Sequence, residues 1–123
     1  MSVINIKRIY DKSEQSDGLR ILVDRLWPRG ISKERAKLAL WAKELAPSNE
    51  LRKWYQHDKH NWKLFKERYF EELDKCPVAM DELISYLEKG NVTFLFSSKE
   101  INFNNAVALQ DYIETKVKFN GLD

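Results

Sequence analysis

Two short, continuous runs of apolar side chains constrain the fold of this chain more than any other feature. One run covers residues 20–23 and stops at Asp24, and the other covers Val92–Phe96 and stops at Ser97. A half-buried strand alternates apolar and polar residues, whereas a strand without alternation is covered on both faces, as in parallel sheets. The two runs therefore predict buried parallel strands, each followed directly by polar residues.

The rest of the chain predicts one more strand and several helices. Ser48 is a good helix cap, with Leu51 and Tyr55 following at helical spacing, and Pro77 suits a first helical position. Asn104 is a second good cap. We expect a strand over Val3–Ile9, a loop over 11–18, and helices over 32–45, from Ser48, over 58–75, from Pro77 to a stop at Gly90, and from Asn104.

This order of elements, β-β-α-α-α-α-β-α, predicts an α/β domain. Helices that lie between two buried strands imply a parallel pair joined by a right-handed crossover. We expect a single domain over residues 1–123, with a small, mainly parallel sheet flanked by helices in three layers. The alternative is an α+β arrangement in which the first two strands form an N-terminal hairpin.

The composition of the chain indicates which kinds of binding partner and which cellular compartment to expect. The 123 residues are 43% hydrophobic, and 21 basic against 19 acidic side chains give a net charge of +2. This excess is too small to predict a nucleic-acid binder. The single cysteine, Cys76, excludes an intramolecular disulfide, and no export signal or membrane-length apolar run is visible. We expect a cytoplasmic protein with no membrane partner.

Polar residues at the two strand ends form the candidate site. Ligands of open α/β sheets bind beyond the carboxyl ends of the strands. Arg25 and Arg29 could clamp a carboxylate or phosphate, and Asp24 could orient an arginine or act as a base. Gly30 would let the backbone approach a ligand closely. Ser97, Lys99, Asn104 and Asn105 would form the opposite wall.

The alternative interpretation is structural: Asp24 and Arg25 pair with each other or with helix ends, and Trp27-Pro28 is packing. His57, the other candidate catalytic residue, could act as an acid–base group because histidine is the residue type suited to proton transfer near neutral pH. With His60 and Asp58 it forms the chain's one histidine cluster, but a third protein ligand is missing, so we predict no metal site. Glycine-rich phosphate motifs are absent, and no cofactor is predicted.

The string GLRILVDRLWPRG at residues 18–30 resembles the family called domain of unknown function 488, in its short YeaO-like branch. The likeness covers nearly the whole chain. It continues through SKE at 32–34, WAKELAPS at 41–48, LRKW at 51–54, HD at 57–58, Phe65, RY at 68–69, EL at 72–73, VTFLF at 92–96 and NNAVAL at 104–109.

The resemblance implies a small α/β fold of bacterial or archaeal origin with no established activity. The family's recurring polar positions map onto Asp24, Arg25, Arg29, His57, Asp58 and Asn105. Members often read Ala-Ala-Lys-Asp where this chain has SSKE at 97–100, and a His common before the paired Asn is Phe103 here. These departures weaken any catalytic role that would rest on that His or acid.

Two functions are therefore compatible with the sequence. The first is a site for an anionic or phosphorylated small molecule at the strand ends, with an enzymatic role left open. The second is a non-catalytic binding or regulatory module for nucleic acid or a protein, built on aromatic and basic residues of the helices. These residues are Trp41, Trp54, Tyr55 and Trp62 among Lys43, Arg52, Lys53 and Lys63. Because large aromatics at helical spacing are usually core, the first function is favoured.

Overall fold

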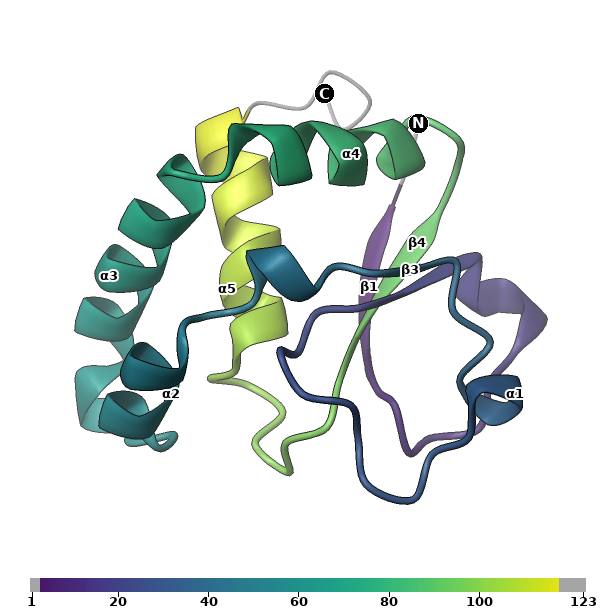
Figure 1. The fold of residues 1–123 in the computed structure, drawn as a ribbon, viewed down its shortest axis with the longest axis horizontal. Helices are drawn as coiled ribbons and strands as arrows, with labels where there is room; N and C mark the ends of the chain where they lie inside the picture. The colour runs from purple at the N-terminus through teal and green to yellow at the C-terminus, as the bar shows by residue number, and fades with distance from the viewer. Residues whose placement is uncertain (1–2, 118–123) are drawn as a thin grey trace.

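The computed structural model describes residues 3–117, and its centre is a four-stranded sheet in which every pairing is parallel (Figure 1). The strands are β1 (Ile4–Arg8), β2 (Leu19–Leu22), β3 (Leu40–Trp41) and β4 (Val92–Phe96), in the order β1-β4-β2-β3. The α/β class is confirmed. The N-terminal hairpin is wrong, because β4 lies between β1 and β2 and pairs with both.

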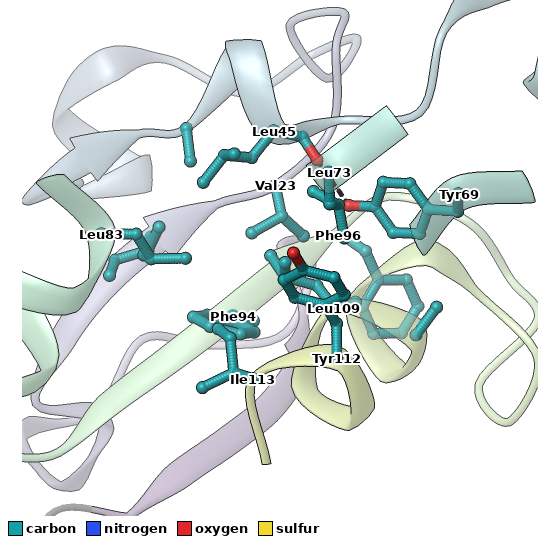
Figure 2. Packing of buried hydrophobic residues seen from close by; sticks show 14 of the residues in the cluster. Val23, Leu45, Tyr69, Leu73, Leu83, Phe94, Phe96, Leu109, Tyr112 and Ile113 are labelled. Carbon is teal, nitrogen blue, oxygen red and sulfur yellow. Dashed lines mark hydrogen bonds between the residues drawn. The ribbon is translucent and has the colours of Figure 1, made fainter. Parts of the chain in front are cut away.

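The helices on one face of the sheet build the main core. They are α2 (Asn49–Tyr55), α3 (Trp62–Asp74), α4 (Pro77–Leu87) and α5 (Asn105–Tyr112), with a π-helical turn over Ile113–Val117. Figure 2 shows Phe94 and Phe96 of β4 packed with Leu109, Tyr112 and Ile113 from the last helical segment. Ser48 and Asn104 cap α2 and α5 as the sequence predicts, and Pro77 is the first residue of α4.

The opposite face is covered more thinly, by α1 (Lys33–Ala36) and the loops beside it. Leu22 and Leu95 point to this side and form a small second cluster with Ile9, Ile31 and Ala36. Figure 1 shows α1 on the other side of the strands from α2, α3 and α5. Side chains of β2 and β4 are therefore buried on both faces, which explains why neither strand alternates in sequence.

The helix expected over 32–45 is wrong. Ser32 does cap a helix, but α1 has four residues and ends at Lys37 in the left-handed conformation. The chain then forms β3, and the N–H groups of Ala39 and Ala42 donate to the carbonyls of Arg20 and Leu22. Pairing with the outer edge of β2 satisfies backbone groups that a continued helix would leave open.

The predicted helix over 58–75 is confirmed from Trp62 to Asp74, but its start differs. Asp58 caps a 3₁₀ turn over Lys59–Asn61, and its side chain accepts a hydrogen bond from the backbone N–H of His60. Helix α3 begins only at Trp62. His57 lies before this turn, so His57 and His60 do not share a helical face.

A buried ion network ties the start of β2 to β1 and to α1. Asp17 and Arg20 are 6% and 5% exposed and pair with each other, and Lys7 donates to the same carboxylate at 3.0 Å. Arg20 Nε also donates to the carbonyl of Ala36 at 2.8 Å. Burial by itself raises the pKa of Asp17, but hydrogen bonds from the Glu14 backbone, Lys7 and Arg20 outweigh it and hold that pKa below its usual value.

No helix among residues 3–117 is both long enough and apolar enough to cross a membrane.

Asp17→Asn is expected to lower the free energy of unfolding by about 3 kcal/mol at pH 7, because it leaves Arg20 buried without its counter-charge. The folded pKa of Asp17 is depressed, so its contribution is present above about pH 4 and is lost as the pH falls through the folded value. Urea unfolding of both proteins should therefore show a difference that shrinks in acid. The control, Glu14→Gln, removes a carboxylate whose side chain is 64% exposed and should cost under about 0.5 kcal/mol; an equal loss in both variants would contradict the assignment.

Gly18→Ala is expected to destabilise the protein far more than Gly30→Ala, although both glycines have positive φ angles. A Cβ at Gly18 would lie 2.3 Å from the carbonyl oxygen of Asn91, which accepts the N–H of Leu19 where β2 begins. A Cβ at Gly30 meets nothing within 4 Å, so that variant should cost only the left-handed backbone strain of about 1 kcal/mol. Thermal unfolding measures both; similar melting temperatures would refute the close approach.

Candidate functional site

A cleft lies where β1, β2 and β4 end. Because parallel strands share one carboxyl edge, the segments that follow them meet there. The cleft has a volume of about 430 Å³. Its lining residues are Tyr10 after β1, residues 24–29 after β2, Pro47, Arg52 and His57 around α2, Ser97 and Ser98 after β4, and Asn105 at the start of α5.

Asp24 joins the two strand ends across 73 residues of sequence. Its Oδ2 accepts hydrogen bonds from the backbone N–H of Ser97 at 2.9 Å and from Ser97 Oγ at 2.7 Å. Its Oδ1 accepts from Asn105 Nδ2 at 3.0 Å. Asn105 Nδ2 also donates to the carbonyl of Val23. Both carboxylate oxygens are thus engaged, and Asp24 holds the loop after β4 in register with the loop after β2.

Two arginines at this edge bind backbone carbonyls rather than carboxylates. Arg25 donates to the carbonyls of Ala46 and Pro47 at 3.0 and 3.1 Å, which fixes the segment leading into α2. Arg8 donates to the carbonyls of Ser97 and Ser98 at 3.1 and 2.9 Å. Carbonyl oxygens are neutral, so these contacts orient each guanidinium without neutralising its charge.

Arg29 lies at the tip of a turn. The N–H of Ile31 donates to the carbonyl of Pro28, and Gly30 takes φ 79°, as the third residue of such a turn requires. Tyr10 Oη donates to the carbonyl of Arg29 at 2.9 Å and ties this turn to the end of β1. Arg29 is exposed, and its guanidinium has no ion-pair partner among residues 3–117.

Arg52 and His57 approach the cleft from α2. Arg52 is exposed, and its guanidinium donates to Asn49 Oδ1 at 3.3 Å. Helix α2 ends at Gln56 in the left-handed conformation, and His57 follows with φ 58°. Non-glycine residues adopt this conformation at a cost of about 1–2 kcal/mol each. These two positive φ angles turn the chain back and place His57 on the rim of the cleft.

The loop after β4 is shaped by further hydrogen bonds. The N–H groups of Asn102 and Phe103 donate to the carboxylate of Glu100 and lower its pKa. Tyr55 Oη donates to the carbonyl of Phe103 at 2.9 Å, and burial raises the pKa of Tyr55 to about 12. Tyr55 therefore stays protonated and a donor at neutral pH, and it anchors this loop to α2.

The structure brings together six of the nine residues predicted for the site: Asp24, Arg25, Arg29, His57, Ser97 and Asn105. Gly30, Lys99 and Asn104 do not line the cleft. Gly30 serves the turn instead. Asn104 is fully buried and caps α5, with Oδ1 accepting from the N–H of Val107 and Nδ2 donating to the carbonyl of Glu100. Lys99 is exposed and follows the lining residue Ser98 in the chain.

Sequence reasoning did not predict Tyr10, Pro47, Arg52 or Ser98 as site residues. It assigned no site role to Leu26, Trp27 or Pro28, and gave Trp27 and Pro28 a packing role only in the structural alternative. Applying the strand-end rule to β1 would have found Tyr10. Arg52 carried no such signal, because its approach depends on how α2 packs against the sheet.

The charges of the cleft are unbalanced. Three lining guanidiniums, those of Arg25, Arg29 and Arg52, stand against one carboxylate, Asp24. Asp24 is already bound by Ser97 and Asn105, and none of the ion pairs within residues 3–117 involves a residue of the cleft. Within the same residues, no three His, Cys, Asp or Glu side chains are grouped as metal ligands. The lining of the cleft therefore carries a surplus of positive charge.

The aromatic residues of the helices pack mainly against one another. Tyr55 is buried and stacks on Phe65 at 4.2 Å, and Trp62 stacks on Phe65 at 5.7 Å. Trp54 is 37% exposed, and the guanidinium of Arg68 lies 4.3 Å from its ring centroid. This arrangement offers little free ring surface for stacking bases, so the nucleic-acid alternative gains no support from it.

A small α/β protein with a basic cleft at the strand ends is the class that this geometry defines. The chain matches the family described as "Inactive DUF488-N3 subclade" over residues 3–121 and belongs to that family. It is 43% identical over 112 residues to "Uncharacterized protein YeaO" of Escherichia coli K12, and this alignment covers 91% of this chain and 97% of the relative. It is 36% identical over 106 residues to "Uncharacterized protein Rv3073c" of Mycobacterium tuberculosis H37Rv, covering 86% and 89%. No solved structure gives a significant match.

Asp24→Asn is expected to destabilise the protein by about 2 kcal/mol, because an amide nitrogen would replace one acceptor and face Ser97 or Asn105 as a second donor. Urea unfolding measures the loss. Asp11→Asn is the control, since Asp11 is exposed and its carboxylate has no hydrogen-bond partner among residues 3–117. Unchanged stability of Asp24→Asn would show that this carboxylate does not hold the two strand ends together.

Proposed function

We propose that the protein binds a small anionic molecule, carrying a phosphate or carboxylate group, in the cleft at the carboxyl ends of the strands. The observation that carries the proposal is the set of three guanidiniums around the cleft without a free carboxylate to match them. Arg29 and Arg52 are the exposed members of this set and are the ones free to reorient toward a ligand. Guanidinium groups bind phosphate and carboxylate oxygens through paired hydrogen bonds.

Binding without chemical conversion is the form of this function that we favour. Asp24 would have to accept a proton to act as a base, but both of its oxygens already accept hydrogen bonds that hold the fold. It is a positioning residue in this proposal. His57 lies on the rim and contributes an imidazole that recognises the ligand. The family's description as inactive agrees with a binding role.

Arg29→Gln and Arg52→Gln are each expected to weaken phosphate binding about tenfold, because each removes one charged hydrogen-bonding group of about 1.5 kcal/mol. Isothermal titration with inorganic phosphate, and then with phosphorylated and carboxylated metabolites, measures the affinity. Added salt should weaken the binding, since the attraction is between exposed charges.

The matched control is Arg68→Gln, which removes the same charge from a guanidinium that lies over Trp54 on α2 and α3. It should bind phosphate as the wild type does. The proposal fails if no phosphate or carboxylate binds or raises the melting temperature. It also fails if Arg68→Gln weakens binding as much as the two cleft variants do.

A further inference from the structure

The cleft combines its basic groups with apolar and aromatic side chains. Leu26, Trp27, Pro28 and Pro47 line it together with Tyr10, beside the guanidiniums of the proposed anion site. An inorganic anion or a sugar phosphate would gain little from such a wall, because its own surface is polar. Ligand sites of this kind pair apolar and aromatic side chains with a few charged groups that fix orientation.

Trp27 is held rigidly at this wall. Its Nε1 donates to the carbonyl of Ile31 at 2.7 Å, and its ring meets the ring of Trp41 edge to face, at 5.3 Å and 73°. The side chain is only partly buried and lines the cleft. Because the indole is already fixed in the free protein, a ligand that packs against it would not have to immobilise it.

Tyr10 couples a second ring to the anion-binding turn. Its hydroxyl donates to the carbonyl of Arg29, so the ring is tied to the residue whose guanidinium is free for a ligand. The guanidinium of Arg8 lies 5.0 Å from the centroid of the Tyr10 ring. Tyr10 and Trp27 come from different strand ends and line one cleft of about 430 Å³, a volume in the range of small-molecule sites. One ligand of that size can therefore reach both a ring and a guanidinium.

From this arrangement we propose that the ligand is an aromatic anion: a planar ring that packs against Trp27 and Tyr10 and carries a phosphate or carboxylate that Arg29 and Arg52 bind. This inference rests on the proposed function and specifies the class of its ligand. Ring–ring contacts add to the burial of apolar surface and are specific for planar groups.

The first experiment compares ligands that carry the same anionic group with and without an aromatic ring, on the wild-type protein. Isothermal titration is carried out with phenyl phosphate, glycerol 1-phosphate and inorganic phosphate, and in parallel with benzoate and acetate. Phenyl phosphate should bind about tenfold more tightly than glycerol 1-phosphate, and benzoate should bind more tightly than acetate by a similar factor.

The second experiment separates the rings from the rest of each side chain. Tyr10→Phe and Tyr10→Leu both lose the hydrogen bond to Arg29 and differ only in the ring, so Tyr10→Phe should keep the preference for phenyl phosphate and Tyr10→Leu should lose part of it. Trp27→Leu should reduce the preference to about threefold or less while inorganic phosphate still binds. Trp54→Leu is the control, because Trp54 lines a different hollow with Arg68 and should leave the preference unchanged.

The outcomes distinguish this inference from the proposed function. If none of the anions binds, the proposed function fails and the inference fails with it. If glycerol 1-phosphate and phenyl phosphate bind equally, the anion site stands and the aromatic ligand is overturned. Equal preferences in Tyr10→Phe and Tyr10→Leu, together with an unchanged preference in Trp27→Leu, would also overturn it.

Discussion

The position of β4 between β1 and β2 is the constraint on which the rest of this structure depends. All five residues of β4 are buried, and its backbone is hydrogen-bonded to a parallel strand on each side. One set of its side chains, including Phe94 and Phe96, fills the core under the helices, while Leu95 packs on the thin side with Leu22. Because both neighbours run parallel to β4, three strand ends meet at one edge and create the place where the cleft forms.

Asp24 extends this pairing beyond the last residues of the strands. The Asp24 carboxylate accepts hydrogen bonds from Ser97 and Asn105. These bonds connect the loop after β2 to the loop after β4, where backbone pairing between the two strands has ended. The basic residues nearby divide into two groups. Arg8 and Arg25 donate hydrogen bonds to backbone carbonyls of the loops, whereas the side chains of Arg29 and Arg52 are exposed at the rim of the cleft. The polar residues at this edge of the sheet thus both hold the loops of the cleft together and give the cleft its unbalanced charge.

Sequence patterns succeeded where a local rule decides the conformation. Ser48 and Asn104 cap helices because a side-chain oxygen can satisfy the first N–H groups of any helix that follows. The pattern over 32–45 misled because Leu38 and Trp41 pack on the thin side of the sheet, whereas Leu45 packs in the main core. Three apolar residues at helical spacing therefore belonged to two different faces. A strand of two residues, such as β3, is too short to carry a pattern of its own.

The sequence alone determined that this chain has two strands buried on both faces and that polar residues follow each of them, because burial requires apolar side chains and loops tolerate charge. It also determined the family, through the string from Gly18 to Gly30. Only the tertiary structure decided which polar residues act on the fold and which face the cleft. Asp24, Arg25 and Asn104 were bound by partners far along the chain or hidden within a cap, and Tyr10 and Arg52 reached the cleft through packing. The physical reason is that hydrogen-bond partners and exposure depend on distances in space, which the order of residues does not contain.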